Sequence, residues 1–364
     1  MRSHSAPRTA IAGVARLFLP LLLPALLHAQ AVTGFGDDAT VPPAGRIRLT
    51  VTNEWTRFDQ RFTAPSGASI DTRSQIRRTP IQLELGLLGR LSLGVMVPSV
   101  GTKVTATYFP DTAGAVHADS LVQSGLSAIG DMEFTARLVW LRTLSDSERY
   151  APRGFHVRSA VTGTFRLGTG SLPRPTQPFG IATGDKQHDI EVASQWDVLM
   201  GRHFWTSLVG RYGHQRPDTR EVRSATPGDP FSPGGPALAH RTLGNYFQIE
   251  ATPRLVLGPY VSIGAQYVYY HKSADQYTAA ATPPSGVPDP SVLDARSEAR
   301  EQRLSFGVVY STVASHARGR ALFPLEVFLR RTQVLSTIND APKGTTWAIG
   351  MRVMGRLWGH ERRR

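Results

Sequence analysis

The stretch IGDMEFTARLVWL, residues 129–141, alternates between two kinds of side chain. One parity carries Phe134, Leu138 and Trp140, and the other carries Glu133 and Arg137. Such alternation is typical of a β-strand with one apolar and one charged face. In a soluble sandwich the apolar face would form the core, whereas in a membrane barrel it would face lipid and the charges would line the lumen. The alternation alone fits both classes of β-protein, so other features of the sequence are needed to distinguish them.

The N-terminus indicates export. Three arginines precede the apolar run LFLPLLLPALL (residues 17–27), and AQA (residues 29–31) supplies the small residues that a signal peptidase requires. The run contains two prolines and is too short to cross a bilayer as a helix. We therefore predict a signal peptide over residues 1–30 that is cleaved during export. The mature chain could then be integral to a membrane only as a barrel.

The composition narrows the chemistry of the chain. Its 364 residues include 34 Gly and 26 Pro but no Cys, which excludes disulfides, thiolate metal sites and a cysteine nucleophile. The formal net charge is +13. In an exported protein, basic side chains fit anionic lipid head groups more simply than nucleic acid. We predict outer-membrane lipid and lipopolysaccharide as partners, and no nucleic acid.

Twelve segments alternate with period two, and the connections between them alternate in length. Connections after even-numbered segments are short, as at residues 89–90 and 201–202, whereas those after odd-numbered segments are long and rich in Pro, Gly and Ser, as at residues 214–242 and 271–300. This sorting is typical of outer-membrane barrels, and a sandwich has no reason for it. The expected strands cover residues 46–55, 79–88, 91–100, 129–141, 155–167, 189–200, 203–213, 245–253, 260–270, 301–311, 322–331 and 346–358.

We therefore predict an all-β fold, a transmembrane antiparallel β-barrel of about 12 strands with long extracellular loops and short periplasmic turns. Residues 31–45 would form an N-terminal periplasmic segment, residues 46–358 the barrel, and residues 359–364 a basic C-terminal tail. The expected location is the outer membrane of a Gram-negative cell, reached through the barrel insertion machinery. The apolar parity of residues 129–141 would then face lipid.

The parity that faces the lumen carries arginines and carboxylates in roughly equal numbers. Charges in a narrow lumen must be paired or they cost several kcal/mol each, so this balance favours cross-strand ion pairs over an anion filter. We predict that Glu54 pairs with Arg352 and helps to close the barrel, and that His156 is a hydrogen-bonded wall residue. The predicted lumen-lining residues are Arg48, Glu54, Glu84, Asp131, Glu133, Arg137, His156, Arg158, Arg166, Glu191, Asp197, Arg211, Arg352 and Arg356.

Four stretches of the chain resemble the MetA-pathway of phenol degradation family of outer-membrane proteins, which are distantly similar in architecture to the long-chain fatty acid channel. They are LSLGVMVPSV (residues 91–100), GLSAIGDMEFTARLVW (125–140), residues 165–198 and PLEVFLRRTQVLSTIN (324–339). In that family a Gly-Asp opens a strand, as Gly130 and Asp131 do here, and a later loop closes with Gly-x-Gly. Ala182 stands here in place of the first of those glycines.

The resemblance implies a transporter-like barrel that passes small hydrophobic or aromatic molecules across the outer membrane. Two alternatives are a plugged barrel that serves a structural or binding role through its long loops, and an outer-membrane enzyme. The sequence lacks Gly-x-Ser-x-Gly and His-Glu-x-x-His motifs, and GTGSLP (residues 168–173) lacks the third glycine of a dinucleotide site. We therefore expect no enzyme activity, no cofactor and no metal.

Overall fold

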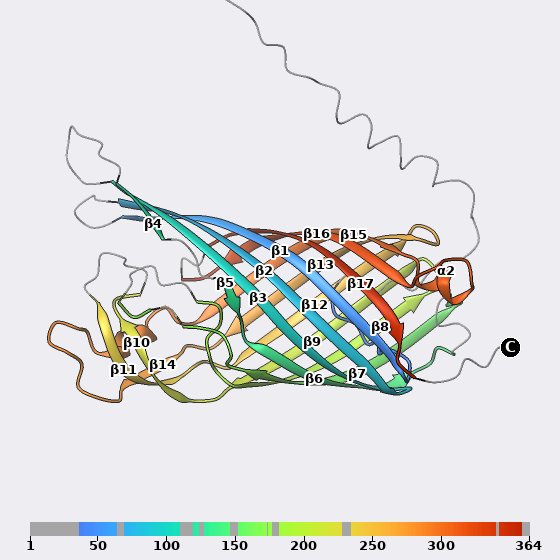
Figure 1. Ribbon diagram of the computed structural model, residues 1–364, viewed down its shortest axis with the longest axis horizontal. Helices are drawn as coiled ribbons and strands as arrows, with labels where there is room; N and C mark the ends of the chain where they lie inside the picture. The colour runs from blue at the N-terminus through green and yellow to red at the C-terminus, as the bar shows by residue number, and fades with distance from the viewer. Residues whose placement is uncertain are drawn as a thin grey trace, which may run out of the picture.

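A computed structural model describes residues 36–63, 69–109, 119–123, 127–145, 152–172, 174–176, 182–227, 234–339 and 342–358. Its fourteen-stranded sheet consists of twelve long strands, which close into an antiparallel barrel where β1 pairs with β17, and of short β4 and β5 beside β3 (Figure 1). The predicted barrel is confirmed. Its strands are β1 (Arg46–Thr63), β2 (Ser69–Leu88), β3 (Leu91–Phe109), β6 (Met132–Arg142), β7 (Phe155–Leu167), β8 (Asp189–Met200), β9 (Phe204–Gln215), β12 (Tyr246–Val256), β13 (Val261–Lys272), β15 (Ala299–Ser311), β16 (Leu325–Thr337) and β17 (Thr345–Arg356).

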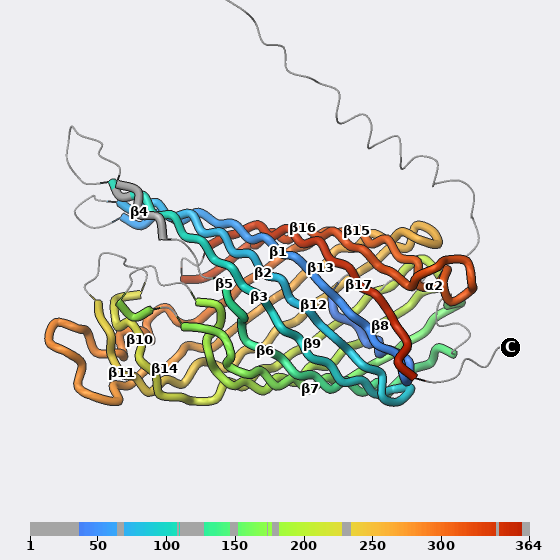
Figure 2. The backbone as a smooth tube through the Cα atoms, in the orientation of Figure 1, coloured from blue at the N-terminus to red at the C-terminus, as the bar shows by residue number. Residues whose placement is uncertain are grey.

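Two rims of the barrel differ in their connections, and we call them the long-loop rim and the short-turn rim. At the long-loop rim, β10 (Asp218–Ser224), β11 (Gly235–Thr242) and β14 (Gln276–Ala279) form a separate three-stranded sheet, the loop sheet, which packs with η2 (Pro290–Asp294). Figure 2 shows the loop sheet at one end of the barrel and the short helix α2 (Val313–Ala317) at the other. No helix in the described ranges is long and apolar enough to cross a membrane.

The first three strands are much longer than predicted, and β4 (Asp119–Gln123) and β5 (Ser127–Ile129) extend the sheet along β3. Their extensions carry polar side chains on both faces, so the alternation that marks a half-buried strand disappears there. Backbone pairing continues nevertheless, from Arg57 opposite Gln75 to Thr63 opposite Ser69. The loop sheet was not predicted either. Its strands lie in two different long loops and, in the described structure, pair with one another and not with the barrel.

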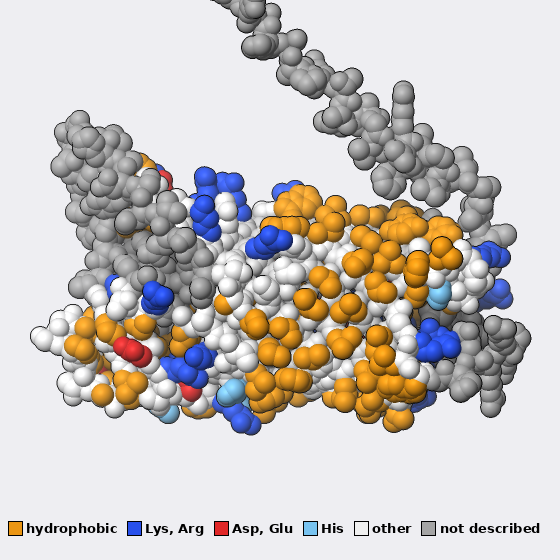
Figure 3. Space-filling view, in the orientation of Figure 1, with side chains coloured by type: hydrophobic (Ala, Val, Ile, Leu, Met, Phe, Trp, Pro, Cys, Tyr) orange, Lys and Arg blue, Asp and Glu red, His pale blue; other side chains and the backbone are white. Residues whose placement is uncertain are grey.

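The barrel is apolar outside and polar inside. Phe134, Leu138 and Trp140 point outward with 44%, 50% and 48% of their surfaces exposed, as predicted. Hydrophobic side chains form a broad apolar belt across the face of the barrel shown in Figure 3, and exposed hydrophobic residues occur on strands all around the barrel. Most inward positions are polar or small, and Gln195 and Glu326 are at most 1% exposed. This is the reverse of a soluble β-sandwich and matches a protein solvated by lipid.

Residues 36–45 lie inside the barrel and not below it, which corrects the predicted periplasmic placement of this part of the chain. The backbone N–H of Ala39 donates to Asp197 on β8 at 3.0 Å, and Arg137 on β6 donates to the carbonyl groups of Asp38 and Thr40 at 3.1 and 3.3 Å. The polar wall therefore supplies the hydrogen bonds that the irregular backbone needs. We call residues 36–45 the inner segment. Residues 1–30 and 359–364, predicted as signal peptide and tail, lie outside the described residues.

Candidate functional site

The lumen holds a cavity of about 980 Å³. Gly36 and Asp37 of the inner segment line one end of it, and the loop residues Leu172, Asp185 and Tyr277 line the end toward the long-loop rim. All twelve barrel strands contribute residues to its lining, β7, β8 and β9 through Arg166, Glu191 and Arg211 among others. The cavity is therefore the interior of the barrel between the inner segment and the long loops.

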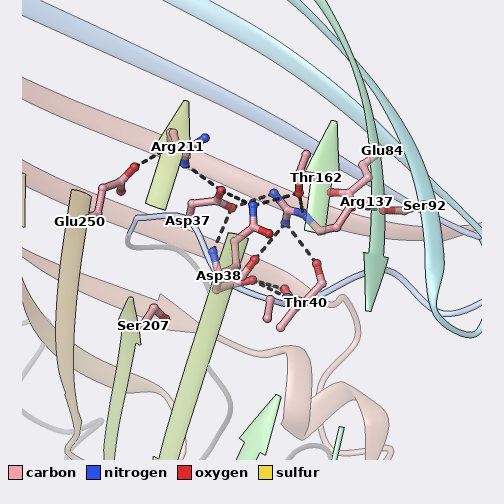
Figure 4. A network of polar contacts seen from close by, with 12 residues as sticks. Asp37, Asp38, Thr40, Glu84, Ser92, Arg137, Thr162, Ser207, Arg211 and Glu250 are labelled. Carbon is pink, nitrogen blue, oxygen red and sulfur yellow. Dashed lines mark hydrogen bonds and ion pairs between the residues drawn. The ribbon is translucent and has the colours of Figure 1, made fainter. Parts of the chain in front are cut away.

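Asp37 anchors the inner segment to three strands at once. Its carboxylate accepts hydrogen bonds from Arg137 on β6 and Arg211 on β9, both at 2.8 Å, and from Gln195 on β8 at 3.2 Å (Figure 4). Asp37 and both arginines are at most one fifth exposed, so the pairs are shielded from water. Charge-assisted hydrogen bonds of this kind are the strongest that side chains make.

Asp38 adds a second anchor. Its carboxylate lies 3.8 Å from Arg254 on β12 and accepts the backbone N–H of Thr40 at 2.9 Å. The apolar side of the segment packs as well, because Ala39 and Val41 form a buried cluster with residues of β6 and β7. Both polar and apolar contacts thus hold the segment against the wall.

Two glycines make room for the inner segment. At Gly86 on β2, a Cβ atom would lie 2.2 Å from the carbonyl oxygen of Pro43, so only glycine lets the segment pass this close to the wall. At Gly36, φ is +73° and a Cβ would meet the hydroxyl of Thr252 at 2.9 Å. The local sequence is therefore suited to a chain that enters the lumen.

Ion pairs line the wall around the inner segment. Arg48 pairs with Glu84, Arg158 with Asp197 at 2.6 Å, and Arg352 with Glu326 at 3.1 Å. Serine hydroxyl groups on the next strands complete two of these pairs, because Ser92 donates to Glu84 and Ser207 donates to Asp197, each at 2.7 Å. Buried charges on this part of the wall are thus satisfied within the protein, as a narrow lumen requires.

A second group of ion pairs lies toward the long-loop rim. Arg211 bonds to Glu250 at 2.8 Å and to Glu191 at 3.2 Å in addition to Asp37. Arg166 joins Glu133 at 3.1 Å and Asp189 at 2.9 Å. Each of these guanidinium groups therefore bridges carboxylates from different strands and fixes them in place.

The predicted pair between Glu54 and Arg352 is wrong. Glu54 instead binds Arg330 at 3.2 Å. In the strand register, Glu54 and Arg330 both lie opposite Ala348, and the small alanine lets the two long side chains meet above it. Arg352 lies four residues farther along β17, opposite Thr50 and Glu326. Parity showed which side chains face the lumen, but only the register shows which of them meet.

Apart from Asp131, the predicted lumen residues fall into three groups. Glu84, Arg158 and Asp197 are buried in the polar network around the inner segment. His156 and Arg356 lie near the short-turn rim, where the His156 ring bonds to the carbonyl oxygen of Arg153 at 2.6 Å. The residues that line the cavity itself are Arg48, Glu54, Glu133, Arg137, Arg166, Glu191, Arg211 and Arg352.

Asp131 has a different role from the one predicted. Its carboxylate accepts the backbone N–H groups of Gly170 at 2.7 Å and Asp185 at 3.0 Å, and so ties the loop after β7 to the start of β6. A Cβ at Gly184 would lie 2.2 Å from this carboxylate. The Gly-Asp and loop glycines that carried the family resemblance therefore meet in space at the long-loop rim.

Several residues of the cavity wall were not predicted. Arg78 lines the cavity and makes no ion pair among the described residues. The predicted strand begins only at residue 79, whereas β2 already includes Arg78. Tyr246, Tyr270 and Phe328 add aromatic rings to the lining. The sequence carried one signal for Asp37, since two consecutive acidic residues precede the first strand of a chain that has more basic than acidic residues.

The loop sheet is fastened to the cavity entrance by Arg241. Its guanidinium donates to both carboxylate oxygens of Asp218, at 2.6 and 2.9 Å, and to the carbonyl oxygen of Asp185 at 2.7 Å. Burial alone would raise the pKa of Asp218, but Arg241 and Arg220 outweigh it and hold that pKa below its usual value. Within the described ranges, no cluster of three His, Asp or Glu side chains could hold a metal ion.

The sequence matches no protein-family model, and a search of curated proteins finds no relative. Among solved structures, the chain is similar to the COG4313 outer membrane channel from Pseudomonas putida F1, with 13% identity, a TM-score of 0.57, and coverage of 88% of this chain and 99% of that one. The transport unit of the autotransporter AIDA-I from Escherichia coli follows with 9% identity, a TM-score of 0.39 and coverage of 94% and 96%. The first likeness shows a shared barrel fold, and the second is too weak to carry an argument.

Proposed function

We propose that this protein is an outer-membrane channel for small aromatic molecules that carry an anionic or hydrogen-bonding group. The long-loop rim would face the outside of the cell, and solutes would enter the cavity from that side. The inner segment would close the path to the periplasm until it moves.

The lining of the cavity is the observation that carries this proposal. A purely apolar solute would bury guanidinium groups without giving them a partner, which costs free energy. An aromatic anion satisfies both kinds of lining group: its charge can bind Arg78, and its ring can stack on Tyr246, Tyr270 or Phe328. This solute class is narrower than the small hydrophobic or aromatic molecules that the family resemblance implied.

Two further observations support the channel. The Pseudomonas putida protein that shares this fold is described as an outer membrane channel. The contacts of Asp131 with Gly170 and Asp185 join the motifs that resemble the MetA-pathway of phenol degradation family, and so support a place in that family.

Current through single refolded proteins in planar bilayers tests the proposal. We expect anion-preferring current that benzoate reduces, since benzoate would bind beside Arg78. Arg78→Gln should lower the anion preference and weaken the benzoate effect severalfold. The neighbouring Arg77→Gln is the matched control, because Arg77 is exposed on the outside of the same strand and should leave both quantities unchanged.

The runner-up is a plugged barrel that serves a structural or binding role. Wild-type protein that inserts and folds but never conducts would favour that role. Equal effects of Arg77→Gln and Arg78→Gln on current would contradict the assignment of Arg78 to the solute path.

A further inference from the structure

A continuous row of four outward-facing side chains crosses four adjacent strands. Arg331 on β16 lies opposite Trp347 on β17, Trp347 lies opposite Trp55 on β1, and Trp55 lies opposite Arg77 on β2. All four are exposed, and the guanidinium of Arg331 lies 5.6 Å above the ring of Trp347. We call these residues the Trp–Arg row.

The row lies at a boundary on the outer surface. On its short-turn side the outward residues become mostly apolar, with Leu329 43%, Ile349 45% and Ile81 47% exposed, while the polar Asn53 and Thr79 lie directly beside the row on β1 and β2. On its long-loop side the outward positions of β1, β2 and β3 carry exposed basic residues, including Arg57 and Lys103. Figure 3 shows basic side chains over these strands, beside the end of the apolar belt.

The positive charge of this face is only partly compensated. Asp59 accepts from Arg73 at 3.1 Å and lies 3.5 Å from Arg57. Within the described part of the chain, Arg77 bonds to the neutral side chain of Asn53, at 3.1 Å, and to no carboxylate. Among the described residues, Arg331 and Lys103 have no carboxylate partner.

Tryptophan prefers the boundary between hydrocarbon and head groups, so Trp55 and Trp347 place the outer edge of the bilayer at the row. Arginine side chains at that level meet the phosphate groups of the lipid, to which guanidinium binds with two parallel hydrogen bonds. Arg77 and Arg331 are three strand spacings apart, or about 14 Å at about 4.8 Å per strand. The two ends of the row can therefore contact separate phosphates of one large head group.

We propose that the Trp–Arg row, with Lys103 beside it, is a binding site for the phosphate groups of lipopolysaccharide in the outer leaflet. The site rests on the proposed outer-membrane location with the long-loop rim outside, and it does not depend on whether the lumen conducts. The site has more basic side chains than carboxylates, and they lie beside the two tryptophans at the edge of the apolar surface. This excess of positive charge favours a phosphorylated glycolipid over a neutral lipid.

Native mass spectrometry of the full-length protein in detergent tests the site, with purified lipid A that bears two phosphates as the probe. The double variant Arg77→Gln/Arg331→Gln should bind it roughly tenfold to thirtyfold more weakly than wild type, at about 1 kcal/mol for each basic side chain at an anionic lipid surface. Arg90→Gln/Arg202→Gln removes the same charge at the short turns and should bind as wild type does. Dephosphorylated lipid A should bind weakly to all three proteins.

Two outcomes would overturn the proposal: equal affinity of the double variant and wild type, or equal binding of phosphorylated and dephosphorylated lipid A. Displacement of lipid A by millimolar inorganic phosphate would also overturn it, since the site would then recognise free anions and not a membrane glycolipid. Channel current measured on the same variants should not change, so failure here is distinguishable from failure of the proposed channel.

Discussion

At the scale of single residues, the lumen is organised by guanidinium groups that each serve more than one carboxylate. Arg211 binds Asp37, Glu191 and Glu250, and so connects the inner segment to β8, β9 and β12. Breaking one partner of such a buried network leaves the other charge uncompensated, which typically costs about 3–5 kcal/mol. These residues therefore act as a unit, and their effects should not be additive.

The pair between Glu54 and Arg330 allows the expected non-additivity to be tested. We expect a double-mutant cycle of Glu54→Gln and Arg330→Gln to show a coupling free energy of about 0.5–3 kcal/mol, because the two side chains are in contact and mostly shielded. The matched cycle of Glu54→Gln and Arg352→Gln should be additive, since Arg352 pairs with Glu326 instead. Urea titration of the refolded protein in detergent measures both, and coupling only in the second cycle would contradict the strand register.

At the scale of elements, the sequence predicted the strands correctly wherever one face of a strand meets lipid. All twelve barrel strands were predicted, and the bounds of β7 and β8 match residue for residue. Prediction failed where lipid no longer imposes alternation, in the extensions of β1 to β3 and in the loop sheet. It failed also for the inner segment, because no periodic pattern reports that a short irregular chain lies inside a barrel.

The two faces of β6 give a direct test at this scale. Leu138→Arg places a charge on the lipid-facing side and should cost about 2–4 kcal/mol if the residue lies near the bilayer midplane. Thr135→Arg places the same charge in the cavity wall and should cost less. Folding equilibria in lipid vesicles compare the two variants; equal losses of stability would mean that the faces are assigned wrongly.

At the scale of the whole molecule, the two ends of the barrel lumen differ. The cavity reaches toward the long loops, while the inner segment occupies the lumen at its other end. Asp37 and Asp38 compensate arginines that belong to the wall, among them Arg137, Arg211 and Arg254. Release of the segment would therefore both widen the path and leave it more positive, which suits the passage of anions.

The conductance of Asp37→Asn/Asp38→Asn in planar bilayers tests this account most directly. Loss of about 3 kcal/mol of anchoring would shift the closed segment toward release by more than about a hundredfold. We predict a larger single-channel conductance than wild type and a stronger anion preference, while Asp59→Asn, an exposed carboxylate on the outer face, leaves both unchanged. If the double variant folds as wild type does, judged by its heat-modifiable mobility on gels, and conducts no more than wild type, the inner segment is not what closes the lumen.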